Sequence, residues 1–539
     1  MRTDQTACCI AGGGPAGMML GLLLARRGVE VLVLEKHADF LRDFRGDTVH
    51  PSTLELMAEL GWLDEFLRLP HTRLEQVTVT IAGRPFTVAD FRKLRLRCPY
   101  VAFMPQWHFL DFLAEKARQY PSFRLLCRTE VVDLIDESGR VVGVRARTPE
   151  GALEVRAALV VGADGRHSTV RERARLEVTA SSPPVDVLWF RLSRRSGEAL
   201  PFFFLERGRA LVCIDRGDYW QIAYVIPSHT YPAVQAAGLA AFRARIAAIV
   251  PSLGDRTTEI GDWEDIKLLT VRVDRLRRWE RRGLLCIGDA AHAMSPAGGV
   301  GINLAIQDAV AAANILGPTL RAGGPSLRDL QRVQRRRELP ARLTQLVQVY
   351  ALGGLYPKSL EEETSKEPPL ALQLLRLLPA LRHLIGYFIG VGIRPEHIRS
   401  DAVSTPHAHA VVRSAARVVN PLVLPLAGTR LLGLYGVIEH RGRRSGKAYR
   451  TPVVVRPTGD GFIVPMPWGE RTDWYRNVRA AGECVIRWKG REYQMVQPEL
   501  IDEEVAARAS FGAFERALMS RLGIDQYLRL RHRNQKSGT

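Results

Sequence analysis

Three consecutive glycines followed by Pro-Ala-Gly, in the stretch CCIAGGGPAGMMLGLLLARRG (8–28), constrain the fold of this chain more than any other feature. Gly12, Gly14 and Gly17 have the spacing G-x-G-x-x-G between a strand-like run and a helix-like run. The first glycine permits a tight turn, the second lets a pyrophosphate approach the backbone, and the third lets the helix pack closely on the strand. Pro15 suits a first helical turn, where its missing N–H is not needed. The pattern predicts a helix N-terminus that binds a phosphate.

A second strand-like run, VEVLVLEK, follows this helix and ends at Glu35. An acidic side chain at this point accepts hydrogen bonds from the adenosine ribose of a dinucleotide. Glu35 would repel a ribose 2′-phosphate, so NADP is disfavoured as the occupant. The order of strand, glycine turn, helix, strand and acid predicts a dinucleotide site, whereas the glycines alone would also fit a plain turn.

The periodicity of apolar residues changes several times along the chain. Its 539 residues are too many for one compact core. Strand and helix patterns alternate at first, a strand-rich stretch follows, and a strand–helix unit then returns. The predicted parts are a dinucleotide-binding Rossmann-like part (1–180, with ~75–105 adding a sheet segment to the next domain), a β-rich substrate domain (181–275), the return of the first domain (276–325), C-terminal helices (326–400), a linker (401–415), a small barrel (416–505) and a basic helical tail (506–539).

Two later motifs extend the dinucleotide pattern. LVVGADGRHSTVR places Asp164 after an apolar strand, and GLLCIGDAAHAMSPAGGVGINLAIQDA places Gly288-Asp289 in the same setting. Over residues 5–400 the chain resembles the flavin monooxygenases of the para-hydroxybenzoate hydroxylase type. The resemblance implies an α/β fold, with a glutathione-reductase-type FAD-binding domain into which a β-sheet substrate domain is inserted. No second strand–GxGxxG–helix unit is present, so a transiently bound NAD(P)H is expected instead of a separate nicotinamide domain.

The resemblance also implies the residues that hold FAD. Asp289 would bind the ribityl chain, Asp164 would lie behind the pyrophosphate, and the N-terminus of the helix after Gly301 would face the flavin and favour its anionic reduced form. Arg45 and Gln106 match further cofactor contacts of the family, and Arg45 and Pro296 match residues near the reacting edge. The expected cofactor-binding residues are Gly12, Gly14, Pro15, Ala16, Gly17, Glu35, Lys36, Arg45, Gln106, Asp164, Gly288, Asp289, Pro296, Gly299, Gly301, Ile302 and Asn303.

The activity implied by the resemblance is an FAD-dependent, NAD(P)H-using monooxygenase, with secondary metabolism as one setting for it. Its flavin C4a-hydroperoxide, formed with O₂, transfers oxygen to an aromatic or quinonoid small molecule, while the protein excludes water and orients the substrate. His292 is interpreted as a structural histidine, and no residue stands out as a base for the substrate. The strand-rich part is expected to cover an apolar pocket with about half of its candidate aromatic side chains, the others being core. The candidates are Trp189, Phe190, Phe202, Phe203, Phe204, Trp220 and Tyr224.

The C-terminal part carries a different pattern. VIEHRGRRSGKAYRTPVVV sets basic residues around Gly442 and Gly446, and a basic glycine turn between strands is a good anion-binding nest. Together with TDWYRNVRAAGECVIRW it resembles the deazaflavin-dependent nitroreductases, which are split β-barrels, over residues 418–500. The resemblance implies a deazaflavin whose phosphates would contact Arg443, Ser445, Lys447 and Arg450. A barrel that has lost its cofactor is the alternative.

Charge and cysteine content exclude several classes of protein. The net charge is +19, but no nucleic-acid-binding motif accompanies it. Seven cysteines without a CxxC pair argue against a disulfide framework and against a structural metal site, so a cytoplasmic location is expected. The most membrane-like segment, 374–393, contains arginines and a proline and is interpreted as a buried or amphipathic helix. Peripheral membrane contact remains an open alternative.

Two other functions stay open from the sequence. A flavin-dependent reductase or dehydrogenase of a quinone or prenyl substrate would use the same fold without transferring oxygen. The C-terminal barrel could instead be a docking module without catalysis. A halogenase is disfavoured because no W-x-W-x-I-P segment is present.

Overall fold

The computed structural model divides the chain into two compact units, Met1–Val403 and Ser404–Thr539. The structure describes residues 2–41, 48–81, 84–180, 185–206, 209–351, 375, 378–399, 428–429, 435–443, 446–466, 472–502 and 526–533. The predicted linker over 401–415 lies outside these residues. All seven cysteines are free thiols, so no disulfide supports either unit.

The first unit is built on a sheet whose parallel strands lie in the order β20-β11-β1-β2-β8. The central strand β1 has β2 on one side and β11 on the other, so the strand order reverses at β1. Sheets of this kind bind ligands beyond the carboxyl ends of the strands at such a switch point. The parallel strands are β1 (Arg2–Ala11), β2 (Val31–Leu34), β8 (Phe123–Leu126), β11 (Gly151–Gly162) and β20 (Leu284–Cys286).

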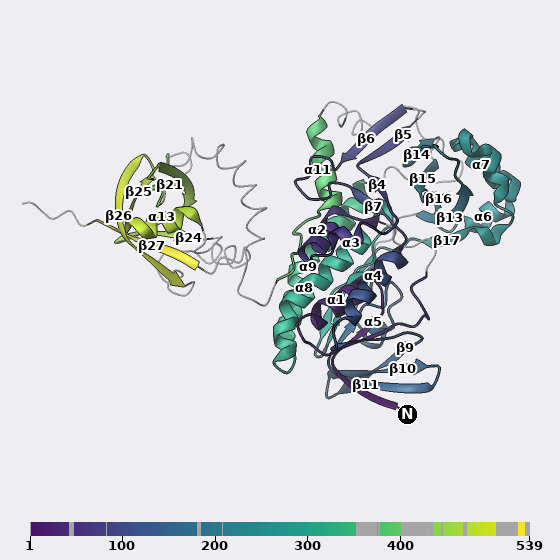
Figure 1. The fold of residues 1–539 in the computed structure, drawn as a ribbon, viewed down its shortest axis with the longest axis horizontal. Coiled ribbons are helices and arrows are strands. Elements are labelled where there is room, and N and C mark those ends of the chain that lie inside the picture. Colours follow the sequence, from purple (N-terminus) through teal and green to yellow (C-terminus); the bar gives the residue numbers. More distant parts are fainter. Residues whose placement is uncertain are drawn as a thin grey trace, which may run out of the picture. The chain divides into compact units, whose positions relative to one another are not determined.

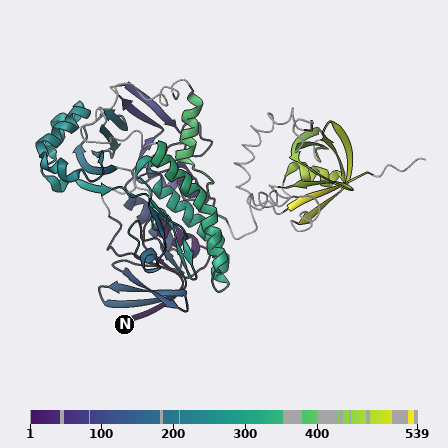
Figure 2. The same cartoon turned by 180° about the vertical axis from the view of Figure 1, so that it is seen from behind.

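An antiparallel meander extends this sheet, and a cluster of helices completes the unit. The meander consists of β9 (Glu130–Glu137), β10 (Arg140–Thr148) and β11. Helix α1 (Pro15–Ala25) starts directly after the glycine turn, is buried from Ala16 to Ala25, and packs against α4 (Gln106–Arg118) and α8 (Gly301–Arg321). Helix α9 (Leu327–Leu346) lies beside α8 in Figure 1 and in the view from behind in Figure 2.

One helical stretch has the length and composition of a membrane span. In Ala297–Arg321, however, 67% of the apolar window is buried inside the unit. Core helices of this kind meet the same length and hydropathy criteria. The burial of α8 against α1 and α9 therefore accounts for its apolar sequence.

A second, seven-stranded sheet has the order β17-β13-β16-β15-β14-β5-β6. Two of its strands, β5 and β6, come from a segment before α4, and β5 pairs in parallel with β14. The sheet is therefore assembled from two distant parts of the chain. Its strands are β5 (Gln76–Ile81), β6 (Arg84–Asp90), β13 (Val185–Ser193), β14 (Phe203–Glu206), β15 (Arg209–Asp215), β16 (Tyr219–Pro227) and β17 (Lys267–Thr270), with α6 (Tyr231–Ala236) and α7 (Leu239–Ile249) packed beside them.

The aromatic residues of this sheet divide between its two faces because side chains alternate along a strand. Phe190 and Tyr224 lie against Phe242 of α7, with ring centroids 5.5 and 5.9 Å away, and belong to a buried core. Trp189 and Phe203 lie on the opposite face and are only partly buried. This opposite face is the one whose aromatic side chains can line a ligand pocket.

Short elements connect the two sheets. A small three-stranded sheet consists of β3 (Thr48–Val49), β7 (Val101–Phe103) and β4 (Thr72–Leu74), and the helices α2 (Pro51–Glu59) and α3 (Leu63–Phe66) lie between β3 and β4 in the chain. Phe103 of β7 lies 5.6 Å from Phe202, which directly precedes β14 of the second sheet, measured between ring centroids. Further short elements are α5 (Thr169–Arg173), β12 (Val178–Ala180), β18 (Asp274–Leu276) and β19 (Glu280–Arg281).

The first unit closes with α11 (Pro379–Gly390) and a segment that we call the C-terminal strap, residues 394–399. Helix α11 packs directly on the backbone of β6, since a Cβ atom at Gly386 would lie 2.3 Å from the carbonyl oxygen of Asp90. The strap binds back onto the long helices: the amide of Asn314 on α8 donates to the carbonyl of His397 at 2.8 Å.

The second unit is an antiparallel sheet of order β22-β21-β25-β26-β27-β24-β23 with one described helix, α13 (Asp473–Ala481), packed on it. This architecture is consistent with the predicted split barrel. Tight turns at TGDG (458–461) and KGRE (489–492) join the antiparallel pairs β23–β24 and β25–β26. The strands are β21 (Tyr435–Arg441), β22 (Ala448–Val454), β23 (Arg456–Thr458), β24 (Gly461–Pro465), β25 (Glu483–Trp488), β26 (Arg491–Asp502) and β27 (Gln526–His532).

The prediction of a basic helical tail over 506–539 is wrong for residues 526–532. These residues form β27, which pairs with β24 and β26. Leu528 and Leu530 are fully buried, whereas Arg529 and Arg531 alternate with them and pair with Asp460 at 2.6 and 3.8 Å. The arginine spacing fits a two-residue period as well as a helical one, and the buried leucines decide for the strand. The predicted barrel, 416–505, thus lacked one strand.

Candidate functional site

Four adjacent parallel strands end at the same edge of the central sheet and bring the predicted motifs together there. Gly12 follows β1, Glu35 follows β2, Asp164 lies just beyond β11, and Gly288-Asp289 lie just beyond β20. Because β1 is the point where the strand order reverses, this edge is the expected ligand site of the fold. Segments far apart in the sequence therefore form one site.

The glycine turn has the geometry of a pyrophosphate cradle. Gly12 has φ +105°, and a Cβ atom there would lie 2.4 Å from the carbonyl oxygen of Ala163. A Cβ at Gly17 would lie 2.0 Å from the carbonyl oxygen of Gly12, so helix and strand touch at this point. A Cβ at Gly14 would meet nothing within 4 Å. The first and third glycines are thus required by the protein's own packing, and the second leaves open space at the tip of α1.

Glu35 is buried and fixes the glycine turn. Its Oε2 accepts a hydrogen bond from the backbone N–H of Gly13 at 2.8 Å, and its Oε1 accepts one from His37 at 3.0 Å. A carboxylate has about four acceptor positions and can accept hydrogen bonds from a protein backbone and from ribose hydroxyls together. Lys36, the next predicted cofactor residue, is exposed, and Ala16 packs against the turn of Gly288, whose added Cβ would lie 3.2 Å from it.

The side chain of Asp164 forms hydrogen bonds within the protein, whereas the resemblance placed it behind the pyrophosphate. Its two carboxylate oxygens accept hydrogen bonds from the Ser168 hydroxyl at 2.5 Å and from the Val170 N–H at 3.0 Å, which caps helix α5. Burial raises the pKa of this carboxyl above its ordinary value. The backbone of Asp164 lies against Gly12, where an added Cβ would be 2.9 Å from the Asp164 Cα. Its side chain therefore positions the loop behind the turn.

Arg166 is a residue of this site that the sequence interpretation missed. Its guanidinium Nη2 lies 3.8 Å from Oδ2 of Asp289, so it joins the two motifs. Its Nη1 is buried and has no hydrogen-bond partner among the described residues. A buried guanidinium N–H without a partner beside a glycine cradle fits an anionic group of a ligand. The sequence signal was available, since Arg166 directly follows the Asp164-Gly165 pair.

The start of α8 lies against the segment that contains β3 and the first turn of α2. Gly299 has φ +62°, and a Cβ there would lie 2.4 Å from Oγ1 of Thr48, whose hydroxyl donates to the Gly299 carbonyl at 2.8 Å. Asn303 accepts from the His50 N–H at 3.0 Å and from the Thr53 hydroxyl at 2.7 Å. The Asn303 side chain therefore fastens α2 to α8, and its expected contact with the cofactor is limited to its backbone.

Five more of the predicted residues lie at the start of α8, before α8, at the start of α4, or outside the described residues. Gly301 begins α8 with space around it, the nearest atom to an added Cβ being that of Met294 at 3.6 Å, and Ile302 follows it in the first turn. The carbonyl of Pro296 accepts from the Gly299 N–H at 3.0 Å and shapes this turn. Gln106 is the first residue of α4. Arg45 lies outside the described residues.

His50, directly before α2, is a buried histidine whose protonation is unfavourable in the folded unit. The ring is 1% exposed, its Nδ1 lies 2.8 Å from the carbonyl oxygen of Ile389 on α11, and its Nε2 is buried without a partner among the described residues. Burial lowers the pKa of His50 from 6.5 to about 4. Protonation would create a buried, charged N–H at Nε2 that has no acceptor among the described residues, which is unfavourable.

Stability is therefore expected to fall as the pH drops from 6.5 to 4, because in this range the unfolded chain binds a proton at His50 and the folded chain does not. The loss is on the order of 3 kcal/mol. His50→Asn should flatten this part of the curve of unfolding free energy against pH, measured by urea denaturation. An equal slope in the variant and the parent would contradict the assignment.

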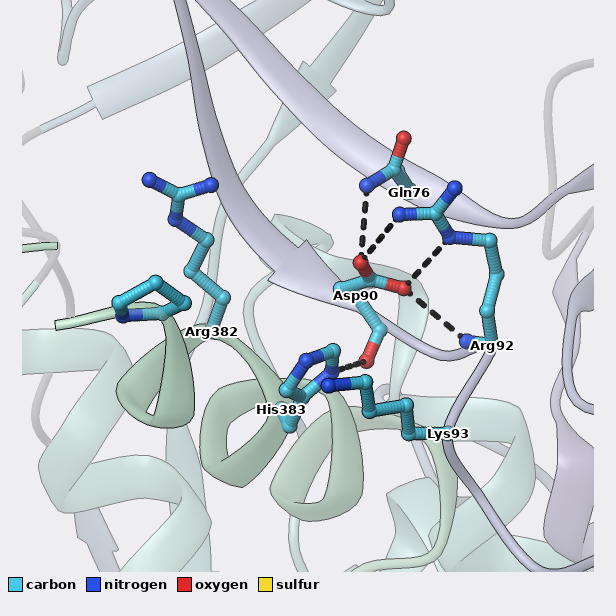
Figure 3. Close-up of a pocket in the computed structure, with 7 residues that line it drawn as sticks. Gln76, Asp90, Arg92, Lys93, Arg382 and His383 are labelled. Atoms are coloured by element: carbon cyan, nitrogen blue, oxygen red, sulfur yellow. Dashed lines mark hydrogen bonds and ion pairs between the residues drawn. The ribbon is translucent and has the colours of Figure 1, made fainter. Parts of the chain in front are cut away.

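A separate hollow of about 400 Å³ lies between β6 and α11 (Figure 3). Asp90 accepts hydrogen bonds there from Gln76 at 2.9 Å and from Arg92 at 2.7 and 3.0 Å, and the Arg92 guanidinium lowers its pKa to about 2. Nδ1 of His383 lies 3.4 Å from the Asp90 carbonyl. The Asp90 carboxylate is thus fully engaged, and none of the predicted site residues line this hollow.

The second unit has its own polar cluster at the predicted anion-binding turn. Asn477 of α13 accepts from the backbone N–H and from Nη1 of Arg443, both at 3.1 Å, and its amide lies 3.2 Å from Nδ1 of His440. The Arg443 guanidinium also lies 3.3 Å from Asp473. One buried amide therefore ties the basic turn to a helix and to a buried histidine. Asn477 belongs to the stretch TDWYRNVRAAGECVIRW that carries the resemblance, but no role was predicted for it.

The other predicted residues of this turn are placed unevenly. Lys447 is exposed, and its carbonyl accepts from the Gly442 N–H at 2.8 Å, which closes the turn. Arg450 lies on β22 and pairs with Glu439 at 3.0 Å, so it is held on the sheet beside the turn. Ser445 lies outside the described residues. Burial lowers the pKa of His440, which stacks on Tyr449, so the ring is neutral at neutral pH.

Two family models match the chain, one for each unit. The FAD binding domain matches residues 5–347, and the quinone reductase that depends on the reduced form of the deazaflavin coenzyme F420 matches residues 412–511. The first match covers both the glycine turn and the turn at Gly288. The second covers the Arg443 turn and α13, and it agrees with the resemblance to deazaflavin-dependent enzymes.

Among similar proteins, 6-methylpretetramide 4-monooxygenase from Streptomyces rimosus is 35% identical over 74% of this chain and 95% of its own length. The structure of anhydrotetracycline hydroxylase from Streptomyces rimosus is 26% identical, with a TM-score of 0.58, over 72% of this chain and 76% of that one. The structure of p-nitrophenol 4-monooxygenase from Pseudomonas putida, 20% identical, shares the fold with a TM-score of 0.56 over 72% and 95% of the two chains.

Proposed function

Because the chain belongs to the FAD-binding domain family of flavoprotein monooxygenases, we propose that it hydroxylates an aromatic, polyketide-type small molecule. The substrate would gain one oxygen atom from O₂, the second oxygen would leave as water, and NAD(P)H would supply the two electrons. The observation that carries this proposal is the 35% identity to a pretetramide hydroxylase over 95% of that enzyme's length. The residues at the switch point fit the cofactor that such a reaction needs.

FAD would supply the redox chemistry, and the chain supplies the binding and the orientation. The N–H groups at the start of α1, beside Gly14, and the guanidinium of Arg166 would hold the pyrophosphate. Glu35 would accept from the ribose and Asp289 from the ribityl hydroxyls. The first turn of α8, from Gly301, would present backbone N–H groups and the positive end of its dipole to the isoalloxazine.

The second sheet of the first unit has a face that carries Trp189 of β13 and Phe203 of β14, and this face is the proposed wall of the substrate pocket. Both side chains are partly buried and lie on the face opposite α7. Flat aromatic side chains fit a planar, fused-ring substrate and exclude water from it. Phe103 and Phe202, in mutual contact, continue this apolar surface toward β3.

The proposal is tested by isotope labelling. The purified chain, supplied with FAD, NADH or NADPH and a set of polycyclic phenols, is expected to give a product that contains one oxygen atom from labelled O₂. A reductase or dehydrogenase on the same fold would consume the reduced nucleotide or form product under anaerobic conditions and incorporate no label. That second outcome would replace the hydroxylase assignment.

For the second unit we propose that a reduced deazaflavin drives reduction of a quinone or enone that the first unit makes or uses. Hydroxylation of a phenol gives a catechol or hydroquinone, and loss of two electrons and two protons from it to O₂ gives a quinone, which is a substrate for a two-electron reductase. The polar cluster of Arg443, Asn477 and His440 supports this proposal because it builds a rigid anion-binding turn.

Deleting residues 404–539 is expected to abolish quinone-dependent oxidation of the reduced deazaflavin while hydroxylation by the remaining unit continues. Loss of assembly or of membrane attachment, with no change in either reaction, would instead identify the second unit as a docking module. The measurement is the change in the absorption spectrum of the reduced deazaflavin with and without a quinone.

A further inference from the structure

A line of buried charged side chains runs through the first unit from the turn at Gly288 to the C-terminal strap. It consists of His292, Asp308 of α8, Arg337 of α9 and Glu396 of the strap. Their side chains are 2, 1, 1 and 8% exposed. Burying so many charges is unfavourable unless each is paired, and apolar side chains of the same volume would hold the helices together equally well. The line therefore calls for an explanation other than stability.

Asp308 is the branching point of this line. Its Oδ2 accepts from the backbone N–H of Gly288 at 3.1 Å and lies 2.5 Å from Nε2 of His292. Its Oδ1 accepts from Nε of Arg337 at 3.0 Å. Burial acts to raise the pKa of Asp308, but the His292 and Arg337 contacts and the Gly288 N–H outweigh it and hold the pKa below its ordinary value. The carboxylate is thus charged and shared among three donors.

The turn that Asp308 holds is the one that presents Asp289. Gly288 has φ +60°, and a Cβ there would lie 3.1 Å from Ala305 of α8 and 3.2 Å from Ala16 of α1. The turn is pressed between the two helices whose N-termini form the site. A shift of the Gly288 peptide would therefore move Asp289 relative to both α1 and α8.

The far end of the line is anchored in the strap. Nη1 of Arg337 donates to the Arg394 carbonyl at 3.0 Å and lies 3.5 Å from Oε1 of Glu396. Glu396 also pairs with Arg336 at 2.6 Å, and its backbone N–H donates to the side chain of Gln307. A continuous set of hydrogen bonds thus joins the strap, α9 and α8 to the turn at Gly288.

We propose that Asp308 is a positioning residue for FAD: it sets the turn of Gly288-Asp289 through the Gly288 N–H, and Arg337 and Glu396 hold its carboxylate in place. The inference rests on the proposed function, since it requires that this turn holds the flavin. It predicts that neutralising Asp308 weakens FAD binding and changes the environment of the bound flavin.

The experiment titrates FAD into full-length apo-protein and follows the visible absorption and flavin fluorescence. In Asp308→Asn one amide oxygen must serve three donors, so the dissociation constant for FAD is expected to rise about 10- to 100-fold, with shifted visible bands. Glu198→Gln is the matched control. It breaks an ion pair distant from the turn in the sequence, between the partly buried Glu198 and the buried Arg256 at 2.6 Å, and should lower the melting temperature without changing FAD affinity.

The inference is overturned if Asp308→Asn binds FAD within about threefold of the parent and with the same spectrum, because the residue would then be structural only. Should this variant fail to fold, Glu396→Gln serves as the second variant, with a smaller effect in the same direction expected and no effect counting against the inference. A parent chain that takes up no FAD would refute the proposed function itself, which is a distinguishable result.

Discussion

Gly14→Val is expected to deprive the first unit of FAD while leaving it folded. Gly14 is the N-cap of α1 with φ −72° and ψ −177°, an extended conformation that any residue adopts, and its added Cβ meets nothing within 4 Å. The protein itself has no need for a glycine here. Branched carbon atoms would occupy the space that we propose for the pyrophosphate at the helix tip, so FAD affinity should fall about 100-fold or more.

The measurement is the FAD dissociation constant together with far-ultraviolet circular dichroism and the melting temperature of the apo-protein. Gly17→Ala is the control with the opposite behaviour. Its Cβ would lie 2.0 Å from the Gly12 carbonyl, so this variant should lose stability with or without FAD. Normal FAD binding by Gly14→Val would contradict the cofactor site proposed at the glycine turn.

Asn477→Leu is expected to weaken deazaflavin binding by the second unit about 10- to 100-fold, with FAD binding by the first unit unchanged. The amide of Asn477 holds the backbone and the guanidinium of Arg443 and also contacts His440. Leucine has a similar volume but supplies no acceptor, so the basic turn would lose the bonds that orient it. Isothermal titration with the deazaflavin coenzyme measures the effect.

Glu492→Gln provides the matched control in the same sheet. Glu492 pairs with Arg487 at 2.6 Å, but the pair is exposed, and surface ion pairs of this kind contribute little. This variant should bind the deazaflavin like the parent chain. If Asn477→Leu also binds it like the parent, the Arg443 turn is not the phosphate site, and the deazaflavin must bind elsewhere on the barrel.

Much of the fold was predictable because it rests on local patterns. The glycine turn, the strand before it and the acid after it follow from short sequence spacing, and the structure places them as expected. The seventh strand of the barrel was not predictable in this way. Alternation of Leu528 and Leu530 with arginines is short and ambiguous, and only pairing with β24 and β26 selects a strand.

The candidate site also contains features that the sequence indicated and features that it did not. The positions of Gly12, Gly14 and Glu35 were indicated by the motif, and the flavin family was indicated by Asp164 and Asp289. The motif did not indicate that Asp164 caps α5, since this role depends on where Ser168 and Val170 lie. The contact between Arg166 and Asp289 was not predictable from the motif either. These residues are distant in the sequence and become neighbours only when β11 and β20 pair.

The sequence by itself determined a dinucleotide site and the two-part organisation, because glycine spacing and strand periodicity act over a few residues and need no tertiary contact. The family resemblance then narrowed the dinucleotide to FAD. Only the tertiary structure decided which polar groups serve the ligand and which serve the protein. A carboxylate such as Asp164, Asp308 or Glu35 takes its role from the donors around it. Those donors come from other strands and helices, and they are brought together only when the sheet order is set.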